Sequence, residues 1–349
     1  MISIECLKGL PLEYESFLIN RYESYFTTCR YLEIYHPDAE INSALIYENG
    51  SLIELLLFEN KGDTTSCLNL LARIDQDIYS EFTKHIFEIF PAIKKVEIIL
   101  SYNRYTFKKS ILLHRNNDYV IKLPSKIDDY FSGLGHSTRK EIKNHKSKLL
   151  RDHHQVNFIT KCGVEIEERV IEKIIQLNIA RMKHKGIIPG KKNSDKVNIH
   201  KYSQYYGVVA YIEIDGEIVA GNIAYILNKR MFGYVVAHDE GFSKYNIGKI
   251  CQLYLIQIAI EKGLSAYHFL WGDNDYKQRF LGKPHIMVSY FIYRAYSFNF
   301  LVIKVRTTLS RALLTVRQSE QLKPIRSVIK SYRKKKMAAS LTKMNLLLH

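Results

Sequence analysis

The sequence contains few cysteines, and their spacing matches no cysteine motif. Five are scattered through 349 residues, at positions 6, 29, 67, 162 and 251, and no two of them form a C-x-x-C pair. An odd number of widely spaced cysteines argues against a disulfide framework, and the missing pairs argue against a structural zinc site. We therefore expect free thiols, a reducing compartment and no metal.

The sequence also has no pattern that would carry the chain into or across a membrane. Its first residues show no basic stretch followed by an apolar run, so no signal peptide is expected. The most apolar stretch near the C-terminus, residues 290–305, is interrupted by Arg294 and Lys304. It is shorter than the roughly 18 to 20 residues that a spanning helix needs. These absences predict a cytoplasmic protein.

Acidic residues are scarce mainly in the last part of the chain. The net charge is +16, but twelve Lys and Arg and a single acid, Glu320, lie after residue 300, so +11 of the excess belongs to residues 301–349. The body before them is only mildly basic, which makes nucleic acid the less favoured partner. With 46% hydrophobic residues, the body is expected to form one large domain or two ordinary ones.

The tail mixes apolar and basic residues at roughly helical spacing and carries four consecutive basic residues at 333–336. A basic residue beside an anionic bilayer contributes roughly 1 kcal/mol. The six basic residues between 326 and 336 would therefore suffice for peripheral binding. We interpret residues 301–349 as a basic amphipathic tail that either contacts the inner face of the cytoplasmic membrane or is a solvated terminus.

The first 124 residues show strands, then a helix, then a strand. Two apolar runs, residues 43–47 and 52–58, flank Asn49-Gly50, which favours a type I′ hairpin, and a third run at 67–72 extends it to a meander. Apolar residues recur at helical intervals over 76–90, and 96–100 is typical of a buried strand. Pro124 marks the predicted boundary between the two halves.

The second half, residues 125–300, repeats this plan without obvious sequence identity. Ser137 is a suitable N-cap for its first helix, which is basic, and Gly186 and Gly263 are suitable ends for two others. The expected elements are a basic helix at 138–152, a strand at 156–160, a helix at 165–185, a loop at 189–203, an antiparallel meander of strands at 208–214, 217–227 and 231–237, a loop at 239–246, a helix at 247–262 and a strand at 266–270.

The junction between the last meander strand and the following helix is a candidate anion site. A helix that begins directly after a strand presents unpaired backbone N–H groups and the positive end of its dipole. The candidate groups are the amides of Asn246, Ile247, Gly248 and Lys249 and the charges of Lys244 and Lys249. Glycines at such a junction are also ordinary backbone punctuation, so the pattern alone is weak.

A second cluster of chemically active residues follows the last expected strand. Group transfer to an amine or hydroxyl needs a group that takes the acceptor's proton and donors that stabilise the charge that develops. Asp273 or Asp275 is a candidate base, and Tyr276 or Lys277 a candidate for binding an anionic substrate or stabilising charge. The same residues also make a plain turn, and His268, on an alternating strand, is also typical of a core histidine.

Three short motifs lie within residues 208–280. Residues 216–220 read G-E-I-V-A, residues 242–248 read F-S-K-Y-N-I-G, and residues 267–277 read Y-H-F-L-W-G-D-N-D-Y-K. They resemble the motifs G-x-x-V-A, Y-x-x-x-S-x-G and F-D-F-L-R-G-x-E-x-Y-K of the GNAT-type acetyltransferase domain in the CelD-like family. That family is associated with cellulose and exopolysaccharide biosynthesis and resembles the FemAB-like transferases in having two GNAT-like halves. The match extends more weakly over residues 123–290.

The resemblance implies a tandem GNAT-like α/β (α+β) fold with mixed, mostly antiparallel sheets flanked by helices. It also implies acyl-CoA binding at residues 246–249 and substrate or catalytic roles for Gly272, Asp275, Tyr276 and Lys277. His268 and Trp271 stand where the family commonly has Asp and Arg, so they are candidate acceptor contacts. The basic helix resembles the family's arginine-rich helix. It is either a solvated face or, through residues such as Arg139 and Lys143, a binder of a phosphate-bearing acceptor.

The sequence therefore predicts an acyl-CoA-dependent acyltransferase, most simply an acetyltransferase, that acts on an amine or hydroxyl of a sugar, nucleotide sugar or cell-envelope glycan precursor. Two alternatives stay open. One is a FemAB-like transferase that uses aminoacyl-tRNA, which would give the basic surface a nucleic-acid role. The other is a non-catalytic module on a GNAT scaffold that binds membrane or nucleic acid.

Overall fold

The computed structural model describes residues 2–272, 274–295, 300 and 305. Asp273 and, apart from Val305, the predicted tail at 301–349 lie outside the described residues. The chain divides into two units, residues 1–294 and 295–349, and the first contains every helix and strand named below. In the part of the chain that the structure describes, no helix combines the length and apolarity needed to cross a bilayer.

The first unit contains two halves that repeat one order of elements: a strand, two helices, three strands, a helix and two strands. The first half consists of β1 (Ile2–Lys8), α1 (Glu15–Tyr22), α2 (Cys29–Tyr35), β2 (Ile41–Glu48), β3 (Ser51–Lys61), β4 (Thr64–Cys67), α3 (Gln76–Ile89), β5 (Lys95–Ser101) and β6 (Ser110–Lys122). The second half consists of β7 (Val156–Cys162), α6 (Glu168–His184), α7 (Asp195–Tyr206), β8 (Gly207–Ile214), β9 (Glu217–Leu227), β10 (Arg230–His238), α8 (Ile247–Glu261), β11 (Ala266–His268) and β12 (Lys283–Tyr293).

Three further helices interrupt this repeat. Two of them, α4 (Ile127–Gly133) and α5 (His136–Asp152), lie between the halves in the sequence. The third, α9 (Asp275–Arg279), lies between β11 and β12.

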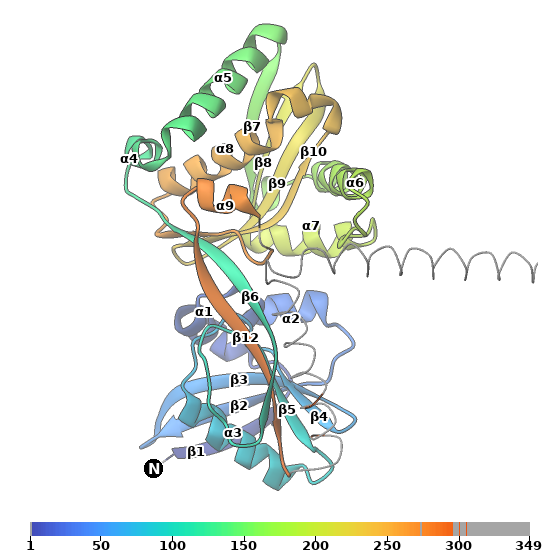
Figure 1. Ribbon diagram of the computed structural model, residues 1–349. Helices are drawn as coiled ribbons and strands as arrows, with labels where there is room; N and C mark the ends of the chain where they lie inside the picture. Colours follow the sequence, from blue (N-terminus) through green and yellow to red (C-terminus); the bar gives the residue numbers. More distant parts are fainter. Residues whose placement is uncertain (1, 273, 296–299, 301–304, 306–349) are drawn as a thin grey trace, which may run out of the picture. The chain divides into compact units, whose positions relative to one another are not determined.

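The halves are joined by an exchange of their last strands. The strands form one sheet in the order β1-β2-β3-β4-β5-β12-β6-β11-β10-β9-β8-β7. The final strand of the first half, β6, therefore pairs with β11 of the second half. The last strand, β12, pairs with β5 of the first half and with β6, beside which Figure 1 shows it. The predicted boundary at Pro124 falls just after β6. This strand therefore belongs to the first half in sequence, whereas in the sheet it lies next to β11 of the second half.

Most of the expected elements are confirmed. Asn49 and Gly50 connect β2 and β3 with φ of 51° and 82°, the left-handed conformation that a type I′ turn requires. The meander β8, β9 and β10 is antiparallel, and β11 lies parallel to β10. Gly186 and Gly263 follow α6 and α8 with φ of 67° at both positions, as expected for glycines that end helices.

Three local expectations are wrong. The run at 67–72 is strand only as far as Cys67, because the chain turns inward at Leu71, where φ is 59°. The predicted loop at 189–203 contains the start of α7, which buries only Ile199, Tyr202 and Ser203, so its periodic signal is weak. The basic helix begins at His136 with Gly135 as N-cap, so Ser137 lies inside the helix.

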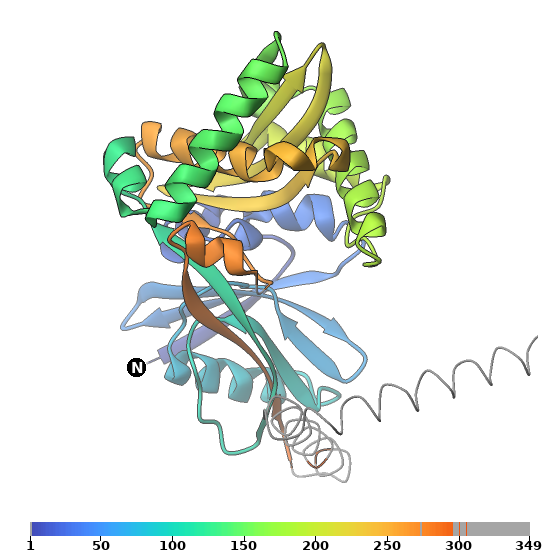
Figure 2. The same ribbon diagram turned by 45° about the horizontal axis from the view of Figure 1, so that its top comes forward.

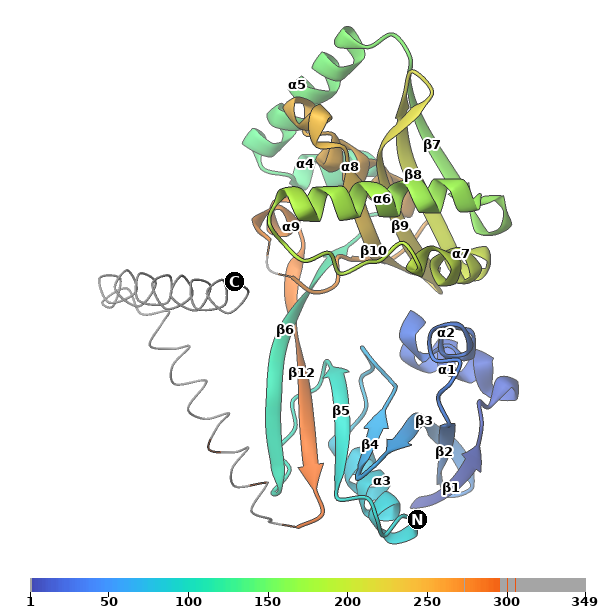
Figure 3. The same cartoon turned by 90° about the vertical axis from the view of Figure 1, so that its right-hand side faces the viewer.

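The sheet of the second half is covered on both faces. On one face, α6 and α7 pack through residues such as Ile174 and Tyr202 against Ile223 and Phe232. On the other face, α8 packs against Met231 and Tyr267, with α4 and α5 beside it (Figures 2 and 3). The apolar character of α8 is thus explained by burial, as expected, and its N-terminus is fixed at the end of β10.

Candidate active site

A cleft opens where β10 and β11 part. These parallel strands pair only from Arg230↔Ala266 to Phe232↔His268, whereas β10 continues to His238. After His268 the chain stays with β6, because the Phe269 N–H donates to the Tyr119 carbonyl at 2.8 Å. The ladder between β10 and β9 shifts register between Gly233 and Val235, which bends β10 at this level. The two strands therefore diverge beyond Phe232.

The cleft encloses about 600 Å³ between α6, the end of β10, the first turn of α8 and the start of α9. It brings together the two clusters that the sequence singled out, because Asn246, Ile247, Gly248 and Lys249 share it with Tyr276. Its lining residues are Arg181, Met182, Lys185, Ile187, Val236, His238, Glu240, Ser243, Asn246, Ile247, Gly248, Lys249, Gln252, Asn274 and Tyr276.

The first turn of α8 offers two of the four expected amides. Asn246 N–H donates to the Ser243 carbonyl at 2.9 Å, and Lys249 N–H donates to the Asn246 carbonyl at 2.8 Å. In the described part of the chain, nothing accepts from the amides of Ile247 and Gly248. These two N–H groups, at the positive end of a buried helix, are suited to an anionic oxygen.

The expected cations are only partly available. Lys249 lines the cleft, but its Nζ lies 2.5 Å from Glu141 Oε1 of α5, and the hydrogen bond from Lys249 lowers the pKa of that carboxyl. Asn246 Nδ2 donates to the same Glu141 oxygen at 3.1 Å. Lys244 is exposed, lies 4.8 Å over the ring of Tyr245 and is not among the cleft residues.

The structure adds cleft residues that the sequence did not indicate. Arg181 donates to the Val236 carbonyl at 3.0 Å, and Lys185 follows one turn later on the same side of the cleft. His238 packs against Gly248, and burial, followed by the charge of Arg181, lowers the pKa of its imidazole. In sequence, Arg181 and Lys185 are ordinary basic residues near a helix end, and only the fold brings them to α8.

The loop around α9 contributes Tyr276 to the cleft, whereas the side chain of Lys277 is buried against the loop that follows β11. Burial raises the pKa of the Tyr276 hydroxyl. Lys277 is 3% exposed, and its Nζ donates to the carbonyls of Leu270 at 3.0 Å and Trp271 at 2.8 Å, with Phe269 at 3.4 Å. Lys277 thus fixes the loop that follows β11. Asp275 is exposed at the start of α9.

The four predicted acceptor contacts lie in three different places. His268 is buried beside Asp118, whereas Trp271 is 44% exposed and stacks on Phe26 at 5.8 Å. Arg139 and Lys143 line a groove of about 550 Å³ between α5 and α8, with none of its lining residues shared with the cleft. The Arg139 guanidinium donates to the carbonyls of Ser132 and Leu134, both at 2.6 Å, at the C-terminal end of α4.

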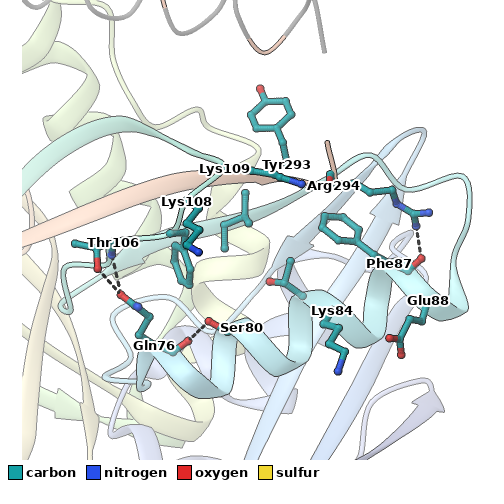
Figure 4. Close-up of a pocket in the computed structure, with 13 residues that line it drawn as sticks. Gln76, Ser80, Lys84, Phe87, Glu88, Thr106, Lys108, Lys109, Tyr293 and Arg294 are labelled. Carbon is teal, nitrogen blue, oxygen red and sulfur yellow. Dashed lines mark hydrogen bonds between the residues drawn. The ribbon is translucent and has the colours of Figure 1, made fainter. Parts of the chain in front are cut away.

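A separate hollow of about 590 Å³ lies between α3, residues 106–109 and the end of β12 (Figure 4). Gln76 Oε1 there accepts from the Thr106 N–H at 2.7 Å, and Arg294 donates to the Phe87 carbonyl. Several of its polar groups are thus bonded to one another, and the cleft at α8 is the better candidate for a substrate site.

Comparisons with known proteins agree with this architecture. Residues 136–278 match the family model described as an acetyltransferase (GNAT) domain. The structure of FemX superposes with a TM-score of 0.61 at 10% identity, over 81% of this chain and 96% of that one. A tandem GNAT protein from the clavulanic acid biosynthesis pathway gives 0.51 at 8% identity, over 85% of this chain and 100% of that one.

A third similar structure is the C-terminal domain of a putative lysylphosphatidylglycerol synthetase from Agrobacterium fabrum, with a TM-score of 0.53 at 10% identity, over 85% of this chain and 95% of that one. A search of curated protein sequences finds no match. At such identities the structural likeness shows the fold. The predicted tandem GNAT-like fold is confirmed, and the chain carries a GNAT-type acyl-transfer domain at residues 136–278.

Proposed function

We propose that the chain binds an acyl-CoA in the cleft at α8 and transfers its acyl group, most simply acetyl, to an amine or hydroxyl of a sugar, nucleotide sugar or glycan precursor. The match of residues 136–278 to a GNAT acetyltransferase domain supports the class of reaction. The sugar-type acceptor follows from the resemblance of residues 208–280 to the CelD-like family, which is the finer part of the proposal.

The observation that carries the proposal is the cleft between the diverging strands, closed at one end by a helix N-terminus. Beyond Phe232, β10 has no strand partner on this edge within the described residues. An extended ligand arm can pair with such a free strand edge. Ile247 and Gly248 line the cleft, and their amides are where a diphosphate would be held. A long donor with a diphosphate at one end and a thioester at the other fits this arrangement.

The cleft also supplies groups for the chemistry. During acyl transfer the acceptor attacks the thioester carbonyl, the C–S bond breaks, and the thiolate leaving group takes up a proton. Tyr276 is the residue that we propose to donate this proton. Tyr276 lines the cleft, and burial raises the pKa of its hydroxyl, so it is protonated at neutral pH.

An aminoacyl donor is the second candidate. The fold is shared with FemX and with a domain of a putative lysylphosphatidylglycerol synthetase. The basic groove with Arg139, Lys143 and Lys146, beside α8, provides a cationic surface next to the cleft that would suit a nucleic-acid donor.

A transfer assay distinguishes the two donors. The full-length protein is incubated with acetyl-CoA and a set of amino sugars, nucleotide-linked amino sugars and neutral glycans, and products are identified by mass spectrometry. In parallel, the same acceptors are offered with a charged, labelled tRNA. We expect a mass increase of one acetyl group on a sugar acceptor. Label transfer from tRNA without any acetylated product would reject the acyl-CoA donor in favour of the second candidate.

A further inference from the structure

A buried carboxylate and a buried imidazole meet where β10 and β11 begin to diverge. Asp118, on β6, is 0% exposed, and His268, the last residue of β11, is 3% exposed. His268 Nδ1 lies 2.7 Å from Asp118 Oδ2, and the Tyr102 hydroxyl donates to the same oxygen at 2.6 Å. Asp118 and Tyr102 belong to the first half in sequence, so the exchange of strands assembles this group.

The hydrogen bonds around Asp118 determine which ring nitrogen of His268 carries a proton. Burial alone would raise the pKa of Asp118, but hydrogen bonds from His268 and Tyr102 outweigh it and hold this pKa below its ordinary value. An ionised carboxylate beside Nδ1 requires a proton on that nitrogen. The neutral imidazole then carries its lone pair on Nε2. This is the arrangement in which a carboxylate orients a histidine base.

The Nε2 atom has no hydrogen-bond partner within the part of the chain that the structure describes, although it is buried. A buried polar atom without a partner is rare and calls for an explanation. The two ring nitrogens face away from each other, so Nε2 is directed away from Asp118. Phe232 of β10 stacks on the ring, with centroids 4.5 Å apart, and prevents the imidazole from turning freely.

The position of His268 in the sheet indicates what Nε2 does. Phe232 and His268 are the last paired residues of β10 and β11, so the imidazole lies where the strands begin to diverge. Asp118 lies on β6 and faces Nδ1 of His268. Nε2 is at the opposite side of the imidazole ring. Other charged groups around the pair come from different elements: Arg73 before α3, Arg230 at the start of β10, and His285, which is opposite Asp118 on β12.

We propose that His268 is the general base of the transfer and that Asp118 is the residue that positions it. This inference rests on the proposed acyl-CoA-dependent function. The acceptor's N–H or O–H proton passes to Nε2 as the acceptor atom forms its bond to the thioester carbonyl. The tetrahedral intermediate collapses, the C–S bond breaks, and the thiolate takes its proton from Tyr276. The imidazolium then returns a proton to solvent, and Tyr276 regains its own.

Two substitutions separate the roles of the ring nitrogens. His268→Asn keeps an N–H that can donate to Asp118 but lacks Nε2, whereas Asp118→Asn keeps the shape but removes the negative charge. His285→Asn is the matched control, because His285 faces the same carboxylate from β12. The readouts are the hydrolysis of acetyl-CoA by the full-length protein, with water in place of the acceptor, and the melting temperature of each variant.

We expect His268→Asn to reduce turnover by about 100-fold or more at unchanged KM for acetyl-CoA, because general base catalysis typically contributes at least that factor. The control should lose less than about 3-fold. Equal losses in His268→Asn and His285→Asn would overturn the inference, as would a KM effect without a kcat effect.

Histidine ¹⁵N spectra of the unmodified protein provide a test that does not depend on variants folding. We expect a downfield Nδ1 proton that disappears in Asp118→Asn, and an unprotonated Nε2 whose resonance shifts when acetyl-CoA is added. A protonated Nε2, or an unmoved Nε2 resonance in a protein that calorimetry shows to bind acetyl-CoA, would contradict the role of His268. Failure to bind acetyl-CoA at all would instead overturn the proposed function itself.

Discussion

Gly248 occupies a tight point between β10 and the first turn of α8. A Cβ added there would lie 2.5 Å from His238 Nδ1 and 3.0 Å from His238 Cε1, both closer than non-bonded carbon contacts allow. The His238 ring is partly buried and lines the cleft, so the open space beside it is the cleft itself. In Gly248→Ala, either the ring moves into the cleft or the first turn of α8 moves away from β10. The first outcome narrows the cleft, and the second displaces the amides of Ile247 and Gly248.

The expected size of the effect follows from the overlap. Inserting a methyl group into a packed contact costs about 1 to 3 kcal/mol. If this cost falls on the bound state, acetyl-CoA should bind roughly 5- to 150-fold more weakly. Isothermal titration of the full-length protein with acetyl-CoA measures the change, and the melting temperature shows whether the variant is folded.

A double-variant cycle tests whether overlap with the His238 ring causes the loss of affinity. His238→Ala removes the ring, so adding Gly248→Ala to it should cost less than about 0.5 kcal/mol of binding free energy, because the overlap is gone. An equal loss of affinity from Gly248→Ala with and without the His238 ring would refute the contact as the cause.

Three further predictions concern the surroundings of the cleft. Glu141→Gln removes the anionic partner of Lys249, so acetyl-CoA should bind roughly 2- to 5-fold more tightly, with a steeper salt dependence in calorimetry; weaker binding would contradict this. Lys277→Met leaves buried carbonyls without their donor, which should lower the free energy of unfolding in urea by about 1 to 3 kcal/mol, and an unchanged midpoint would speak against it. Burial lowers the pKa of His238, so the unfolded chain takes up a proton at higher pH than the folded chain. The free energy of unfolding should therefore fall as the pH drops below about 6.5, and it should fall less steeply in His238→Gln. If the unmodified protein and His238→Gln lost the same stability at each pH, His238 would not contribute to this dependence.

Local patterns were sufficient for much of the second half. The strands β8 to β10 are short apolar runs divided by clear turn residues, and α8 is a long apolar helix that follows β10 closely. The sequence therefore located the first turn of α8 and the loop with Tyr276, and the fold brings the two together at one cleft. In contrast, α7 was missed because only a few of its residues are buried, too few to produce a helical period.

Contacts between distant residues explain what the sequence could not reveal. The charge of Lys249 is paired with Glu141, 108 residues away, so counting lysines overstated the cations of the site. Arg181 reaches the cleft only because α6 crosses the end of β10. Asp118 was not singled out, since the exchange of β6 between the halves is a long-range pairing that no local pattern encodes.

The central claim is that the cleft between β10 and α8 binds an acyl-CoA, and calorimetric titration of the full-length protein with acetyl-CoA tests it most directly. We predict saturable one-site binding that is abolished in Gly248→Glu, which places a carboxylate at the amides of Ile247 and Gly248, and retained in Ser80→Glu, which adds the same charge on α3. No binding to the unmodified protein, or equal binding to both variants, would contradict the account.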